Sequence, residues 1–168
     1  VSNDSLAVVA GHLRSLLSVQ MPDEGFSHLR YYAPKQLTRL MSALNEQDRA
    51  LFSGPIREWL AFQSNGELSR FDSDGSQSAR KASDEGWFLL TETHLASLAR
   101  SAREEFVDKL GRFLDTKDRA RLEQWIGEAT ALGFQTEKDV SRYAELAVVH
   151  GERIKLAEIQ AILCDPGL

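Results

Sequence analysis

The chain has 168 residues, of which 42% are hydrophobic and 27% charged, and its net charge is −5 at pH 7. This composition suits one soluble domain, or two small lobes, with enough apolar material to form a core. The acidic balance argues against a nucleic acid or an anionic membrane surface as partner, because both of these bind basic protein surfaces.

The first part of the chain mixes helix and strand patterns. Apolar residues at steps of three and four predict a helix over residues 5–19. Residues 26–32 alternate as in a strand, with His28, Arg30 and Tyr32 on one face. Pro34 then opens a second helix, at a position where its missing N–H costs nothing, and Asn45 caps a short third helix.

A β-hairpin follows these helices. Residues 56–62 and 67–71 read as strands, and Asn65-Gly66 between them is the strongest hairpin signal in the chain. Residues 72–86 are polar and have almost nothing to bury, which predicts a flexible linker. The few strands predict only a small sheet, which is marginally stable unless helices cover it.

The second half of the chain predicts three consecutive amphipathic helices. The first begins at a cap, Thr91 or Thr93, and has the clearest apolar stripe. The stripe consists of Leu95, Leu98, Ala99, Ala102, Phe106, Leu110, Phe113 and Leu114. The second helix runs over 117–132, the third begins after a cap at Thr136, and a last short helix is predicted near 154–163.

Together these elements predict an α+β fold. We expect a small α/β first lobe with a β-hairpin, followed by an all-helical second lobe. The predicted domains are residues 1–71 for the first lobe, 72–86 for the flexible polar linker and 87–168 for the helical lobe.

The sequence contains no recognisable catalytic or metal-binding pattern. The four histidines are not spaced as ligands on one helix face and have no cysteine beside them, so we expect surface or partly hydrogen-bonded side chains. There is no glycine-rich phosphate loop and no G-x-S-x-G motif. The single cysteine, Cys164, excludes an internal disulfide and fits a reducing compartment. We therefore expect no enzyme activity, no cofactor and no metal.

Two short segments look suited to protein binding. Arg30-Tyr31-Tyr32 and Arg57-Glu58-Trp59 each place an arginine beside large aromatic residues on a predicted strand. Tyr, Trp and Arg are the residue types that most often anchor protein interfaces. The alternative is an ordinary arrangement, with one strand face in the core and the other salt-bridged at the surface. With Trp87, the candidate partner-binding residues are Arg30, Tyr32, Arg57, Trp59 and Trp87.

The order of several motifs carries a resemblance to a known family. LRYYAPKQLTRLMSAL is followed by ALFSGPIREWL, and later by LTETHLASLARSAREEFVDKL and ALGFQTEKDVSRYAEL. In this order they resemble the type VI secretion effector chaperones (the Tap or TEC adaptors), in which R-[FY]-Y-D-P precedes a helix and G-P-[IV]-x-x-W follows it. The chain differs in having Ala33 where the family often has Asp, and in lacking the family's α/β segment before the first helix.

The resemblance implies a non-enzymatic adaptor in the cytoplasm of a Gram-negative bacterium. Such proteins bind a specific toxin effector and help load it onto the VgrG spike protein, so the implied partners are a toxin effector and VgrG. Neither nucleic acid nor membrane is implied as a partner. Two alternatives stay open: an immunity-type protein that binds the toxic domain, and a small helical enzyme fragment. A deep pocket with converging titratable groups would favour the enzyme.

Overall fold

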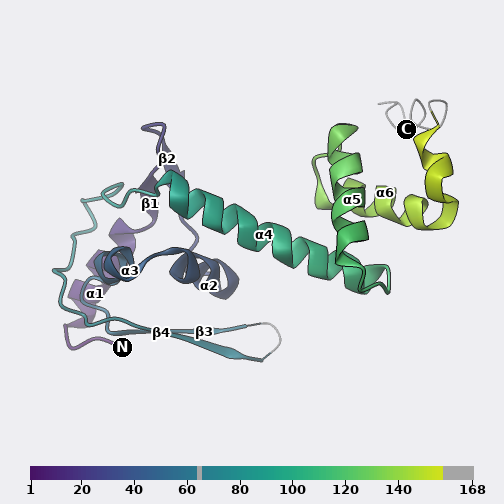
Figure 1. Ribbon diagram of the computed structural model, residues 1–168. Coiled ribbons are helices and arrows are strands. Elements are labelled where there is room, and N and C mark those ends of the chain that lie inside the picture. The colour runs from purple at the N-terminus through teal and green to yellow at the C-terminus, as the bar shows by residue number, and fades with distance from the viewer. Residues whose placement is uncertain (64–65, 157–168) are drawn as a thin grey trace. The chain divides into compact units, whose positions relative to one another are not determined.

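The computed structural model describes residues 1–63 and 66–156 (Figure 1). The described residues form six α-helices and two antiparallel hairpins, with the strands in the first half, so the predicted α+β class is confirmed. Their contacts divide the chain into two compact units, Val1–Ser101 and Ala102–Leu168. The sequence placed its boundaries at the two ends of the polar tract, whereas the contacts place the division inside the longest helix.

The first unit begins with a helix and a small hairpin. α1 (Leu6–Ser15) starts at its cap, Ser5, and ends before the last residues of the helix predicted there. The chain enters β1 (Ser18–Gln20) instead, which pairs antiparallel with β2 (Phe26–His28). The strand predicted over 26–32 is therefore short, because the chain turns after it.

β1 has a neighbour on each side. On the side away from β2, residues 86–90 run along it in the parallel direction. The Gln20 N–H donates to the Phe88 carbonyl at 2.9 Å, and the Leu90 N–H donates to the Gln20 carbonyl at 2.9 Å. β1 is thus central, and β2 lies at an edge.

α2 (Pro34–Ala43) and α3 (Glu46–Ser53) follow, as Pro34 and Asn45 predict. The Asn45 side chain caps α3, since its Oδ1 accepts the N–H of Asp48 at 2.8 Å. α2 has no side-chain cap, because Ala33 has no acceptor to offer.

β3 (Glu58–Phe62) and β4 (Leu68–Asp72) form the predicted second hairpin. Gly66 has φ +83°, the left-handed conformation that a turn glycine adopts freely, while Asn65 lies outside the described residues. The hairpin buries the side chains of Trp59 and Ala61 on one face and exposes Leu60, Phe62 and Leu68 on the other.

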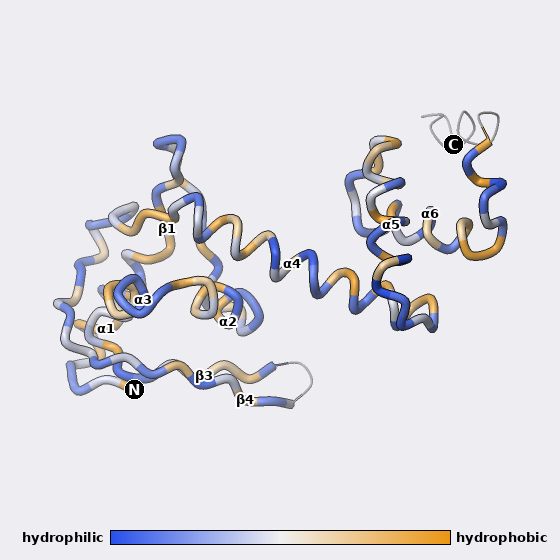
Figure 2. Tube along the Cα trace, viewed as in Figure 1, coloured by the Kyte–Doolittle hydropathy of each residue, from blue (hydrophilic) through white to orange (hydrophobic). Residues whose placement is uncertain are grey.

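Aromatic rings form the centre of the first unit's core. The ring centroid of Phe52 lies 5.6 Å from that of Trp59 and 5.2 Å from that of Phe88. Leu16, Leu40 and Met41 are fully buried around them. Figure 2 shows how apolar positions recur along the helices of this unit. Each such side chain contributes roughly 1.5–3 kcal/mol when fully buried.

α4 (Glu92–Phe113) starts at the Thr91 cap, where the His94 N–H donates to the Thr91 hydroxyl at 3.3 Å. The predicted apolar stripe of α4 packs into two separate cores. Leu95 and Leu98 pack on the core of the first unit, whereas the buried residues Phe106, Val107 and Leu110 belong to the core of the second. Phe113, the last residue of the helix, is exposed.

The second unit is helical, as expected. α5 (Arg119–Ala131) and α6 (Glu137–His150) are capped by Asp118 and Thr136, and a 3₁₀ turn, η1 (Gly151–Lys155), follows. Most of the helix predicted near 154–163, and Cys164, lie outside the described residues. None of the helices in the described part of the chain is long and apolar enough to cross a bilayer.

Candidate protein-binding surface

All five predicted binding residues lie in the first unit, but they differ in exposure. Arg30 and Tyr32 are exposed in the turn after β2, and 61% of the Tyr32 surface is accessible. Arg57 is exposed immediately before β3. Trp59 is only 8% exposed, and Trp87 is half-buried. Three of the five side chains are thus available to a partner, while the two tryptophans lie in or against the core.

Trp59 supports the turn that carries Arg30 and Tyr32. Its indole Nε1 donates to the Ser53 hydroxyl at 2.9 Å. The ring of Tyr31 meets it edge to face with centroids 6.2 Å apart, and the Tyr31 hydroxyl donates to the Leu13 carbonyl at 2.8 Å. Burial, together with neighbouring Tyr32, raises the pKa of this hydroxyl, so it stays protonated as a donor. The half-buried Tyr31 therefore fixes the turn that carries Arg30 and Tyr32 to the core of the first unit.

Trp87 belongs to a polar network around a fully buried histidine. His12 Nδ1 accepts the backbone N–H of Arg80 at 3.2 Å, and its Nε2 lies 3.0 Å from the Phe52 carbonyl. Since Nδ1 is an acceptor, the ring proton sits on Nε2 and is donated to that carbonyl. Trp87 joins the network because its indole N–H donates to the Ser15 hydroxyl at 2.9 Å.

This network attaches the polar tract to α1. Burial, and to a smaller extent the charge of Arg80, lowers the pKa of His12 despite the Phe52 carbonyl, which raises it. The Arg80 guanidinium lies 4.8 Å from the centroid of the Trp87 ring. The tract predicted as a flexible linker is thus in contact with the first unit at Arg80, and again where the Gly86 N–H donates to the Ser18 carbonyl at 3.1 Å.

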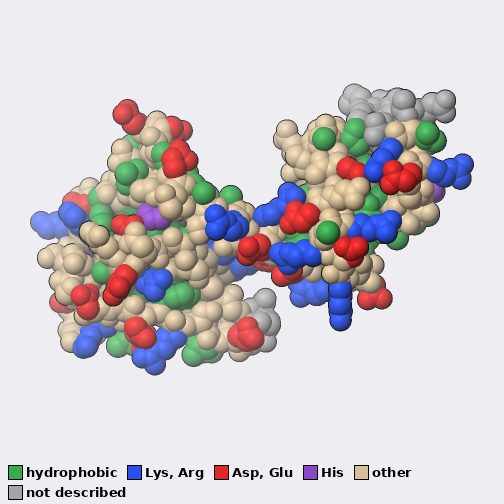
Figure 3. Space-filling model, viewed as in Figure 1, with side chains coloured by type: hydrophobic (Ala, Val, Ile, Leu, Met, Phe, Trp, Pro, Cys, Tyr) green, Lys and Arg blue, Asp and Glu red, His purple; other side chains and the backbone are tan. Residues whose placement is uncertain are grey.

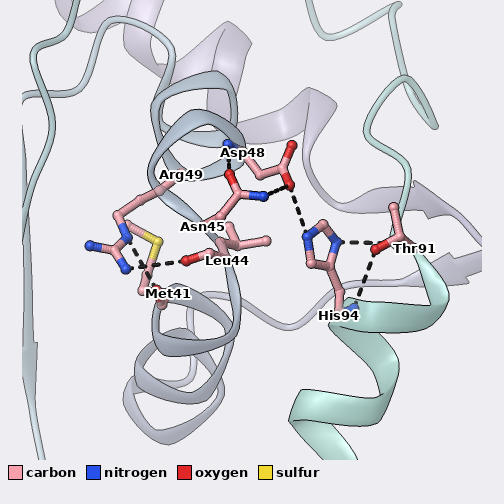
Figure 4. Close-up of polar contacts among 7 residues, drawn as sticks. All are labelled: Met41, Leu44, Asn45, Asp48, Arg49, Thr91 and His94. Atoms are coloured by element: carbon pink, nitrogen blue, oxygen red, sulfur yellow. Dashed lines mark hydrogen bonds and ion pairs between the residues drawn. The ribbon is translucent and has the colours of Figure 1, made fainter.

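A second buried histidine, His94, joins α3 to the start of α4 (Figure 4). Its Nε2 lies 3.0 Å from Asp48 Oδ2, and its Nδ1 accepts the Thr91 N–H at 3.3 Å. The Asn45 amide donates to the same Asp48 oxygen at 2.6 Å. Both ring nitrogens are therefore occupied by structural bonds.

Neither buried histidine was expected from the sequence, which predicted surface or partly bonded side chains. His12 and His94 both fill core positions with their two ring nitrogens hydrogen-bonded. Among the described residues, no three His, Cys, Asp or Glu side chains gather as a metal site.

Exposed aromatic and basic residues lie on β2 and in the turn after it. All three residues of β2 are exposed, Phe26 by 67%. The rings of His28 and Tyr32 have centroids 6.4 Å apart, and no described residue pairs with the Arg30 guanidinium. We call this set, Phe26, His28, Arg30 and Tyr32, the β2 strip. The alternation of the sequence places His28 beside Arg30 and Tyr32, but offers no reason to single out Phe26.

In the described part of the second unit, a compact cluster of titratable groups lies beside a hollow of about 330 Å³. The Tyr143 hydroxyl donates to Glu128 at 3.0 Å, and Lys155 pairs with Glu128 at 2.9 Å. Burial and Glu128 raise the pKa of Tyr143 to about 12, and hydrogen bonds to Glu128 and Glu152 raise that of Lys155. Burial raises the pKa of Glu128, but hydrogen bonds from its neighbours outweigh this and lower it. Each of these shifts moves the pKa of its group further from neutral pH.

The fold is α+β, and its first unit exposes aromatic and basic side chains along the β2 strip. A family model described as "Domain of unknown function (DUF4123)" matches residues 1–51, which contain α1, β1, β2, α2 and most of α3. DUF4123 is the domain of type VI secretion effector adaptors. The β2 strip lies inside the match, whereas Arg57, Trp59 and Trp87 lie beyond it. No curated protein and no solved structure matches the chain.

Proposed function

We propose that this protein is an adaptor that binds a type VI secretion toxin effector and helps load it onto the VgrG spike. The observation that carries the proposal is the DUF4123 match over residues 1–51. On this proposal the protein acts in the cytoplasm by binding, without catalysis and without a cofactor.

The β2 strip supports a binding role within the matched residues. It combines two aromatic side chains and a histidine with an arginine that no described residue neutralises. An interface anchor gains most when it is held in place before binding, because less side-chain freedom is then lost. The contacts that Tyr31 makes with Trp59 and Leu13 hold the turn in this way.

The five predicted residues therefore take two roles in the proposal. Arg30, Tyr32 and Arg57 contact the effector or the spike directly. Trp59 and Trp87 do not contact the partner but hold the surface segments in place. Trp59 does so through Tyr31, and Trp87 through its bond to Ser15 and its contact with the Arg80 guanidinium.

Affinity capture from the native cytoplasm tests the function. The full-length protein is the bait, and we expect mass spectrometry to identify VgrG together with one toxin. The double variant Arg30→Ala/Tyr32→Ala should lose the toxin, while Arg142→Ala, an exposed position in the second unit, should keep it.

Each outcome has a definite meaning. Recovery of neither VgrG nor a toxin, from cells that express both, would contradict the adaptor function. Recovery of both proteins with equal yield by the β2-strip variant would leave the function standing and refute the strip as the binding surface. Capture of the toxin through its toxic domain, without VgrG, would favour an immunity protein.

A further inference from the structure

The outer edge of β2 has backbone groups that no described strand pairs with. Hydrogen bonds from Leu29 N–H to the Leu17 carbonyl (2.8 Å) and from Met21 N–H to the Gly25 carbonyl (2.7 Å) fix which residues of the hairpin face each other. Bonded and non-bonded pairs alternate in an antiparallel ladder, so the N–H and C=O groups of Phe26 and His28 point away from β1. No described strand or bridge lies along that side.

The charges along this edge are opposite at its two ends. Glu24 and Arg30 lie three residues before and three residues after Ser27. Neither side chain forms an ion pair with a described residue. The β1–β2 hairpin projects from the first unit in Figure 1, and Figure 3 shows acidic side chains gathered at its tip.

Two copies of this edge, paired antiparallel, would have complementary charges at their ends. If two β2 edges meet antiparallel about Ser27, Phe26 of one copy stands opposite His28 of the other, and each such pair exchanges two backbone hydrogen bonds. The same register brings the turn before β2, which carries Glu24, next to the start of the turn after β2 of the other copy, which carries Arg30, so the two side chains can meet at each end of the paired edges. Opposite charges facing each other across two strands stabilise the pairing, and like charges destabilise it.

The backbone at Glu24 adds a second reason to connect this carboxylate with binding. Glu24 has φ +65°, the left-handed conformation that suits glycine. Its N–H donates to the Met21 carbonyl at 3.1 Å in the turn. A turn of this kind usually has glycine at this position, so the glutamate lowers the stability of the turn.

We propose that the outer edge of β2 pairs with the same edge of a second copy of this chain, forming a two-fold symmetric dimer through a continuous sheet. The self-complementary charge pattern about Ser27 favours a second copy over an unrelated extended segment as the occupant. Two short edges bury far less than the roughly 1,200 Å² of a stable interface, so the dimer is weak, with a Kd of about 10 µM to 1 mM.

Sedimentation equilibrium of the purified full-length protein, without effector, tests this proposal independently of the proposed function. We expect a monomer–dimer equilibrium at protein concentrations around the expected Kd, between about 10 µM and 1 mM. Glu24→Arg and Arg30→Glu should each weaken it about tenfold, because each places like charges opposite one another at two symmetric positions. The double variant Glu24→Arg/Arg30→Glu should restore it, and Arg142→Glu should leave it unchanged.

Two further variants distinguish an effect on dimerisation from an effect on folding stability. Glu24→Gly relieves the turn and removes the carboxylate, so its melting temperature should rise while its dimerisation weakens. Ser27→Cys in a Cys164→Ser background should form an intermolecular disulfide, because the two Cα atoms of a non-bonded pair lie about 4.5 Å apart. Ser78→Cys, exposed in the polar tract, should not.

A monomer at all concentrations would overturn the proposal. So would a dimer that the charge reversals leave unchanged, or one that the double reversal does not restore. If the protein is monomeric but both single reversals abolish capture of the toxin, the edge pairs with an extended segment of the effector, and the second copy is refuted as its occupant.

Discussion

His12 and Arg80 are joined by a hydrogen bond across 68 positions of sequence, in which the backbone N–H of Arg80 donates to His12 Nδ1 at 3.2 Å. The bond attaches the polar tract to α1, and it determines the tautomer of a fully buried ring. Because Nε2 carries the proton for the Phe52 carbonyl, protonating Nδ1 would place two donors face to face at Arg80. The neutral ring is therefore a requirement of the folded state.

This requirement makes stability depend on pH. The pKa of His12 is lowered from its ordinary value of 6.5, first by burial, so the unfolded chain binds a proton at a higher pH than the folded one. The stabilising contribution is complete above pH 6.5 and decreases as the pH falls through 6.5 towards the lowered value. Each unit by which the pKa is lowered costs at most about 1.4 kcal/mol at acidic pH.

His12→Gln should reduce this pH dependence, because glutamine cannot take up a proton. We expect the variant to be less stable than the parent at pH 7, and the gap to narrow at pH 5. Urea unfolding followed by tryptophan fluorescence at several pH values measures both. Parallel stability curves for the two proteins between pH 7 and 5 would contradict the role of His12. His28→Gln, at an exposed position, is the matched control and should follow the parent curve.

Local patterns predicted most of the helices. α2, α3, α5 and α6 begin where a proline or a capping side chain stands in the sequence, since both act on the adjacent turn. The polar residues of the tract have no such local signal. Arg80 is held by a ring that lies 68 positions away, and this contact is a property of the tertiary fold.

The candidate binding residues were predicted by residue type, and residue type does not determine exposure. Arg30 and Trp59 belong to segments that look alike in the sequence, each an arginine near aromatic residues. Trp59 is buried because the hairpin turns this face towards Phe52 and Ser53. The helix predicted over 5–19 includes Ser18 and Val19 of β1, because three strand residues are too few to show a strand period against the preceding leucines.

Gly54 is predicted to tolerate no side chain. It has φ +57°, and a Cβ there would lie 2.4 Å from the His12 ring. Gly54→Ala should therefore lower the free energy of unfolding by more than about 2 kcal/mol, from backbone strain and from displacement of a buried ring. Gly66→Ala separates the two effects, because Gly66 has φ +83° but nothing within 4 Å. Its loss should be only about 1 kcal/mol, and equal losses at both sites would show that contact with His12 has no cost.

Ala33→Asp should stabilise α2. Ala33 stands at the cap position in an extended conformation, with φ −82° and ψ 120°, and makes no side-chain bond to the first turn. An aspartate there can accept a free N–H of this turn, which adds about 0.5–2 kcal/mol. Thermal unfolding measures the gain. Ala33→Ser should give a similar gain, because it supplies an acceptor without a charge; a gain with Asp alone would point to the neighbouring Arg30 instead.

Trp59→Phe should destabilise the first unit by a route that a second substitution can reveal. Phenylalanine keeps most of the ring packing with Phe52 and Tyr31, but it leaves the buried Ser53 hydroxyl without the indole N–H that now lies 2.9 Å away. A buried polar group that loses its partner costs about 1–3 kcal/mol.

Ser53→Ala in the Trp59→Phe background should recover part of that loss, because it removes the unsatisfied hydroxyl. Urea unfolding of the parent, the two single variants and the double variant forms a complete thermodynamic cycle. If the two effects add without coupling, the indole–hydroxyl bond contributes nothing to stability.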